Sequence, residues 1–291
     1  NTAVGSSAMA ANTTGEKNVA VGALTLDANT TASFNTAIGY EALGGNTSGA
    51  SNVAVGLDSL KSNTTAGENT AVGTNSLKNN TTGSDNTAVG HSASLLNTTG
   101  DNNVSMGYFA LEKNTTGDKN TEIGNECMLA NTTANLNVAV GSEAMKANTT
   151  GTQNVAVGAF ALDGNTTGTE NTCVGYAALD VVQTTHRNTA MGHLALQNTF
   201  GTQNTGFGWR VGRTITSGGN NVLIGSDAGN SGSPSGEITT GSNNVVLGDN
   251  NISNLFCADT SISSSDSRDK TDVESFNIGL AWIEALRPVT Y

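Results

Sequence analysis

Large and charged side chains are scarce in this sequence. Of its 291 residues, 4% are aromatic, 12% are charged and only 2 are proline, whereas 36 are glycine. A typical soluble domain carries about 25% charged residues. So few large apolar side chains cannot fill one thick globular core of this length. A disordered chain is excluded as well, because disorder goes with high charge, abundant proline and few β-branched residues.

Several classes of partner are disfavoured. No run of 18 apolar residues occurs, so we expect no membrane span. The net charge of −12 repels phosphate backbones and argues against nucleic-acid binding. Cys127, Cys173 and Cys257 are too widely spaced for a disulfide framework, and no Cys/His cluster predicts a metal site. We therefore expect no cofactor and no metal. The first residues, NTAVG, already belong to a repeat, as in an excerpt from a longer polypeptide.

A strict internal repeat dominates the chain. An asparagine recurs every 17 residues for eleven steps, at Asn1, Asn18, Asn35, Asn52, Asn69, Asn86, Asn103, Asn120, Asn137, Asn154, Asn171 and Asn188. The next steps, to Asn204, Asn221, Asn244 and Asn251, are 16, 17, 23 and 7 residues long. Counted from this asparagine as position 1, the unit reads N-(T/V)-A-(V/I/M)-G-x-x-(A/S)-(L/M)-x-x-N-T-T-G-x-x. Such a period is the signature of a repeat architecture.

Each unit predicts one short strand and a tight turn. Positions 1–5 are short, β-branched and bounded by glycine, which is typical of a strand, and positions 2 and 4 share one face. Ser105, Glu122 and Cys173 replace alanine at position 3, so we expect that face to be close-packed but accessible to water. Positions 6–9 suggest a second short strand. Positions 12–15 (N-T-T-G) form a turn, and this explains the Asn-Thr-Thr triplets better than glycosylation does.

The predicted fold class is all-β, a parallel β-solenoid with one unit per coil. Coils about 4.8 Å apart would give a rod of roughly thirteen coils, with the recurring asparagines stacked in a hydrogen-bonded ladder. A 17-residue coil is thin and carries two apolar rows, at the strand and at position 9. We infer that other chains cover one of the rows, most simply in a parallel homotrimer. The alternative is a monomer that exposes its leucines.

The repeat unit resembles two families of extended proteins. N-T-A-V-G-x-x-A-L is similar to the head repeats of trimeric autotransporter adhesins, which are trimeric left-handed β-rolls. It is closer still to the 17-residue arrays of phage tail-fibre proteins. The resemblance covers about residues 1–250 and implies a scaffold rather than an enzyme.

The C-terminal residues differ from the repeat. Ser265, Asp266, Arg268 and Lys270 lie in the sequence SDSRDK, and Leu280, Ile283 and Leu286 then follow in helical steps up to Pro288. With LRPVTY at residues 286–291, this stretch resembles the start of the endosialidase-type intramolecular chaperone (peptidase S74) family.

That family's domain trimerises, guides fibre folding and then cuts itself off. The resemblance implies a cut between Ser264 and Ser265, with Ser265 as nucleophile, Lys270 as its base, and Asp266 and Arg268 in support. A serine needs such a base to become nucleophilic.

These observations give three domains and a leading function. We expect a solenoid shaft at 1–220, an irregular cap and β transition at 221–264, and the incomplete chaperone segment at 265–291. The expected function is a virion tail fibre or appendage, extracellular and homotrimeric, which contacts other virion tail proteins and a host surface receptor or glycan. A bacterial trimeric adhesin is the alternative, and a polysaccharide-degrading tailspike is the third interpretation.

Overall fold

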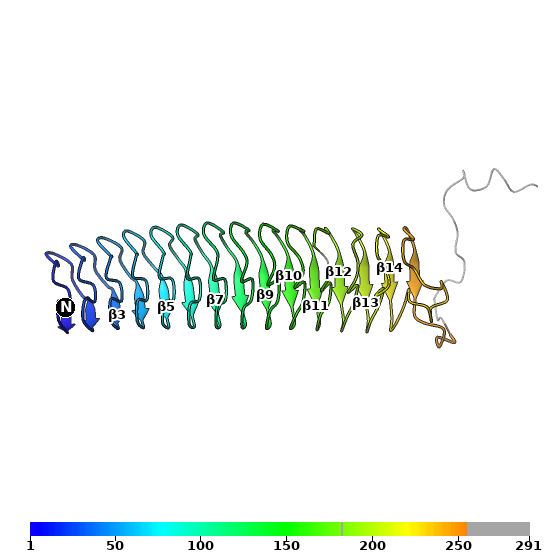
Figure 1. The fold of residues 1–291 in the computed structure, drawn as a ribbon, viewed down its shortest axis with the longest axis horizontal. Helices are drawn as coiled ribbons and strands as arrows, with labels where there is room; N and C mark the ends of the chain where they lie inside the picture. Colours follow the sequence, from blue (N-terminus) through cyan, green and yellow to red (C-terminus); the bar gives the residue numbers. More distant parts are fainter. Residues whose placement is uncertain (182, 255–291) are drawn as a thin grey trace, which may run out of the picture. The chain divides into compact units, whose positions relative to one another are not determined.

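The computed structural model describes residues 1–181 and 183–254, and these contain a single parallel sheet. Its fifteen strands follow the order of the chain, each paired in parallel with the next (Figure 1). They are β1 Thr2–Val4, β2 Val19–Val21, β3 Thr36–Ile38, β4 Val53–Val55, β5 Thr70–Val72, β6 Thr87–Val89, β7 Val104–Met106, β8 Thr121–Ile123, β9 Val138–Val140, β10 Val155–Val157, β11 Thr172–Val174, β12 Thr189–Met191, β13 Thr205–Phe207, β14 Val222–Ile224 and β15 Val245–Leu247.

The register of the sheet confirms one unit per coil. Ala3 pairs with Ala20, and Ala20 with Ala37, so identical unit positions stack directly. Residues Asn1–Asn251 form one compact unit, and none of the described residues is helical. The predicted all-β parallel solenoid is therefore confirmed. The predicted helix and the whole segment 265–291 lie outside the described residues.

The second strand predicted at positions 6–9 is wrong. Leu24 and Leu26, at positions 7 and 9, have φ angles of 57° and 51°, which no strand contains. Their N–H groups point in opposite directions along the rod: Leu24 donates to Ser6 O, and Leu26 donates to Ala42 O. Alternating left-handed residues thus satisfy the backbone between coils without a strand.

Two columns of stacked side chains, the alanines of position 3 and the leucines of position 9, pack against each other in the interior. From Ala20 onward, alanines at position 3 and leucines at position 9 are fully buried, as Ala37 and Leu43 illustrate. A methyl group added to Gly206, at position 3, would lie 2.9 Å from Leu196 Cγ and 3.1 Å from Val211 Cγ1. Positions 3, 8 and 9 therefore meet inside the coil. The expected water access at position 3 is wrong, because Ser105, Glu122 and Cys173 are fully buried.

Two asparagine columns close each coil. Position 1 and position 12 donate to the same carbonyl at position 15: Asn154 Nδ2 lies 2.8 Å and Asn165 Nδ2 3.1 Å from Gly168 O. Between coils, Asn154 Oδ1 accepts the backbone N–H of Asn171 at 3.0 Å. The predicted asparagine ladder is confirmed. The position-12 amides that match the glycosylation triplet are buried from Asn29 onward in the regular coils, which closes them to modification in the folded chain.

The glycine at position 5 has a steric cause. Gly124 has a φ of 149°, and a Cβ atom there would lie 2.2 Å from the carbonyl oxygen of Gly141 in the next coil. Any side chain would force adjacent coils apart.

The longer steps in the repeat are accommodated by loops. β13, β14 and β15 continue the strand column, and Asn244 N still donates to Asn221 Oδ1 at 3.0 Å. The extra residues of the 23-residue step lie between β14 and β15, where Ile238 N donates to Gly229 O. Residues 221–251 thus combine a regular sheet with irregular turns.

Candidate functional site

The residues predicted for self-cleavage cannot be placed. Ser265, Asp266, Arg268 and Lys270, together with the Ser264–Ser265 bond, lie outside the described residues. The features that remain are the two outer faces of the solenoid, its aromatic side chains and its buried polar groups.

The strand face, which we define as the outward side chains of positions 2 and 4, carries an apolar row at position 4 and either threonine or valine at position 2. The position-4 row reads Val4, Val21, Ile38, Val55, Val72, Val89, Met106, Ile123, Val140, Val157, Val174, Met191, Phe207, Ile224 and Leu247. None of the fifteen is buried, and Ile123 is 42% exposed. The exposed apolar row is therefore the position-4 row. A single chain buries its position-9 leucines, contrary to the monomer with exposed leucines that the sequence offered as the alternative.

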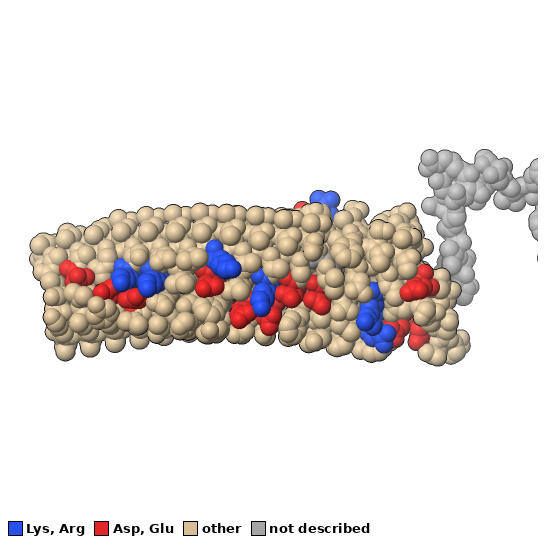
Figure 2. Space-filling view, in the orientation of Figure 1, with Lys and Arg blue, Asp and Glu red and all other residues tan. Residues whose placement is uncertain are grey.

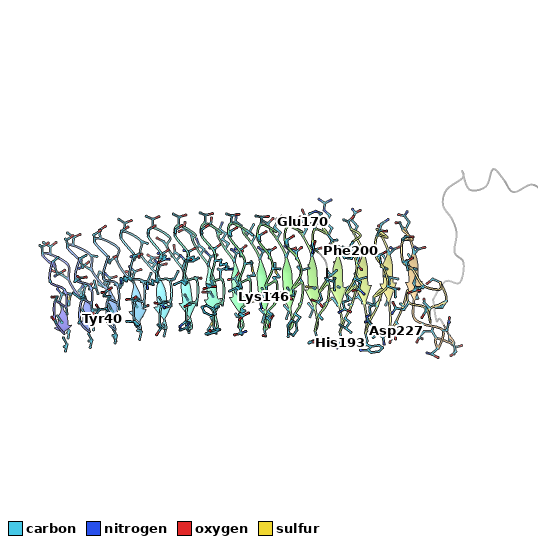
Figure 3. All side chains as sticks on the ribbon, viewed as in Figure 1. Tyr40, Lys146, Glu170, His193, Phe200 and Asp227 are labelled. Carbon is cyan, nitrogen blue, oxygen red and sulfur yellow. The ribbon has the colours of Figure 1, made fainter. Side chains whose placement is uncertain are left out.

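The turn face, defined by positions 7 and 10, carries most of the charge. Lys146 Nζ lies 2.7 Å from Glu126 Oε2 in the preceding coil and 2.9 Å from Glu143 Oε2 in its own. Figure 2 shows charged side chains gathered in a band along this side of the molecule, where Figure 3 places Lys146. Hydrogen bonds to the two carboxylates raise the pKa of Lys146. Such partly exposed pairs contribute little stability, so the band mainly keeps this face hydrated.

Two neighbouring carboxyl groups on the turn face have altered acidity. Asp163 and Asp180 occupy position 10 on adjacent coils and are half-buried. Burial, followed by the nearby charge of Asp180, raises the pKa of Asp163 to about 6. Burial also raises the pKa of Asp180, against a hydrogen bond from Gln197. The sequence analysis did not single out this pair.

Aromatic side chains stack between coils at position 6. The ring centroids of Tyr176 and His193 lie 5.2 Å apart at an interplanar angle of 14°, and those of His91 and Tyr108 lie 5.4 Å apart at 25°. The guanidinium carbon of Arg210 lies 4.6 Å from the Trp209 ring centroid. Since stacked rings cover one another's faces, these contacts support the rod itself.

The interior contains one unpaired acid. Glu122 at position 3 is fully buried, and neither carboxyl oxygen has a hydrogen-bond partner. Burial raises its pKa well above the ordinary 4.5. Burial and the neighbouring Glu122 also raise the pKa of Cys127, and burial alone raises that of Cys173, so both thiols are unreactive.

Metal clusters and membrane-spanning helices are both lacking in the part of the chain that the structure describes. Among residues 1–181 and 183–254, no group of three or more His, Cys, Asp or Glu side chains is placed to hold a metal ion. Within the same ranges, no helix has the length and apolar character to cross a bilayer.

Comparisons with protein-family models, with curated proteins and with solved structures found no match.

Proposed function

We propose that this chain is the shaft segment of a parallel homotrimeric fibre that serves in attachment, most simply a virion tail fibre. The observation that carries the proposal is the uninterrupted apolar row at position 4 of the strand face. Fifteen partly exposed side chains present on the order of 1,000 Å² of apolar surface, more than monomers usually leave uncovered and close to the contribution of one partner to a standard interface.

Assembly through the strand face fits the geometry of the coil. The leucine column already fills the interior, so the position-4 row has no partner within its own chain. The turn face is charged and suits solvent. Three parallel chains that turn their strand faces toward a common axis would bury the apolar row and leave the charged faces outside. The resemblance to trimeric repeats favours three chains.

Lysines on the strand face should break the assembly. We expect sedimentation equilibrium of the full chain to give three times the 29.4 kDa of one chain. Val72→Lys combined with Val157→Lys should give a monomer, because two charges per chain would be buried without partners. Ala130→Lys, at the unit position where Lys113 already stands, is the matched control and should remain trimeric. A wild-type monomer at micromolar concentration, with native circular dichroism, would refute the assembly, whereas a dimer would refute the threefold symmetry.

The self-cleavage implied by the C-terminal resemblance belongs to the same proposal. Lys270 would take the proton of the Ser265 hydroxyl, and the resulting oxygen would attack the Ser264 carbonyl. As the Ser264–Ser265 amide bond breaks, Lys270 would return the proton to the Ser265 nitrogen, so that an ester replaces the amide and the nitrogen becomes a free amine. Water would then hydrolyse the ester and release the two chains.

Expression of the complete gene tests this chemistry. The wild-type polypeptide should yield a product ending at Ser264, and Ser265→Ala and Lys270→Ala should remain at full length. Intact mass measurement gives the end of each product. A full-length wild-type product, identical in processing to both variants, would show that the motif carries no cleavage here.

A further inference from the structure

A notch of about 460 Å³ opens on the turn face near the N-terminal end of the rod. Leu24, Asp27, Glu41 and Lys61 line it, around the half-buried backbone of Gly44 and Gly45. Its volume falls within the range of about 300–1,000 Å³ that is typical of small-molecule sites. The three contributing coils are those that begin at Asn18, Asn35 and Asn52.

The notch has a local cause in the sequence. Positions 10 and 11 hold at least one side chain in every other repeat, such as Asp27–Ala28, Lys61–Ser62 and Lys146–Ala147, but they are both glycine at 44–45. Two missing side chains in one coil leave a gap between the side chains of the coils on either side. No regular feature of the fold requires Gly44: its φ is not positive, and a Cβ atom would meet Glu41 O at 3.3 Å and Asp27 Oδ1 at 3.4 Å, contacts that a small adjustment relieves.

The walls of the notch are polar but nearly balanced in charge. The Lys61 ammonium is paired with Glu41 and lies 3.6 Å from Asp58 Oδ1, while Lys78 holds the other Asp58 oxygen at 2.8 Å. The hydrogen bond from Lys61 also lowers the pKa of Glu41, which keeps this carboxylate charged at neutral pH. Because each cation already faces carboxylates, the notch offers no free positive charge to an anion. Three carboxylates against two ammonium groups disfavour anions further.

A neutral ligand rich in hydroxyl groups suits this arrangement. Carboxylate oxygens of Asp27 and Glu41 accept hydrogen bonds, the Lys61 ammonium donates them, and the aliphatic side chain of Leu24 offers an apolar contact. We propose that the notch binds one sugar ring of a neutral glycan. The inference gives a ligand class to the attachment role proposed above, and rests on that role.

Multivalency makes a weak site useful. An open notch binds a single ring weakly, but three copies on one fibre raise the apparent affinity for a repetitive surface without any new contact. On the proposed trimer, the turn faces point away from the buried strand faces, so all three notches stay accessible.

Saturation-transfer NMR on the full chain tests the inference, with methyl α-D-glucopyranoside, methyl α-D-mannopyranoside and methyl β-D-galactopyranoside as probes. We expect transfer to at least one of them with the wild-type protein. Gly44→Leu should reduce the signal at least fivefold, because a leucine fills the notch without a change in charge; Leu95 and Leu129 occupy the same unit position elsewhere. Asp27→Asn, a change confined to the wall, should also reduce it.

The matched control is Ala147→Leu, a neutral substitution on the same face outside the notch, which should leave the signal unchanged. Equal signals from wild type and Gly44→Leu, or no transfer to any of the three glycosides, would overturn the inference. Sedimentation of the same samples separates it from the fibre proposal: a monomer that binds through the notch contradicts only the assembly, and a trimer that binds none of the probes contradicts only the sugar site.

Discussion

Asn154→Ala should destabilise the solenoid by about 3 kcal/mol, because it leaves a buried backbone N–H without an acceptor. Asn154 Oδ1 accepts from both the backbone N–H and Nδ2 of Asn171, at 3.0 and 3.1 Å, and all of these groups are buried. Alanine accepts neither bond. The Asn171 side-chain amide still donates to Thr185 O, but the buried backbone N–H of Asn171 cannot turn toward water. The loss in free energy of unfolding exceeds that of an ordinary hydrogen bond, because the unpaired N–H is removed from water without a new acceptor.

Chemical denaturation followed by circular dichroism measures this effect. The matched control is Asn125→Ala, which removes an exposed asparagine at position 6 of its coil and should change the free energy of unfolding by less than about 0.5 kcal/mol. Equal effects of the two substitutions would mean that the asparagine column does not hold the coils together.

Glu122→Ala should stabilise the protein at neutral pH. The carboxyl group of Glu122 is fully buried, lies between Ser105 and Ala139 in the sheet register, and has no hydrogen-bond partner. Alanine is the usual residue at this unit position, so it fits the interior without a clash. The substitution removes the cost of burying an acid.

The sign of the pH dependence follows from the raised pKa of Glu122. The folded state favours the protonated form of Glu122. The contribution of this form to the free energy of unfolding is therefore fully present below the ordinary pKa of 4.5, and it is lost as the pH rises toward the folded-state pKa. Each pH unit between the ordinary pKa and the raised folded-state pKa lowers the stability by about 1.36 kcal/mol.

Denaturation midpoints measured from pH 4 to pH 8 test the role of this acid. The wild type should lose more stability as the pH rises than Glu122→Ala and Glu122→Gln, which keep only the loss caused by the raised pKa values of Asp163 and Asp180. The alanine variant should be the more stable of the two. A wild-type profile parallel to that of Glu122→Gln would show that Glu122 does not titrate as a buried acid.

The repeat was enough to predict the strand at the start of each unit, the register and the asparagine ladder, but not the absence of a second strand. A 17-residue period with a fixed asparagine allows only one way for identical positions to stack, and the hydrogen bonds of Asn154 follow from it. The sequence did not reveal which strand face points inward. Successive side chains of a strand point to opposite faces, so Ala20 lies on one face and Val19 and Val21 on the other. Because both faces are apolar, the pattern does not say which of them is buried. Only the three-dimensional structure places Ala20 inside, against the leucine column, and turns Val19 and Val21 outward.

The turn segment and the notch needed the three-dimensional structure for different reasons. Leu24 and Leu26 adopt left-handed conformations that are rare for leucine, so local preference pointed to a strand there. The sequence shows two glycines, Gly44 and Gly45, at positions 10 and 11. It does not show that side chains from the neighbouring coils line the space that these glycines leave open.

A cryo-electron microscopy map of the purified full chain tests the central claim most directly. We predict layers about 4.8 Å apart along the rod, one 17-residue unit in each layer, and three parallel chains that share their strand faces. The density of the position-1 asparagines should form a continuous column inside each chain. A map in which one unit spans two layers, or in which neighbouring layers run antiparallel, would contradict the solenoid; parallel single rods with solvent-exposed strand faces would contradict the assembly.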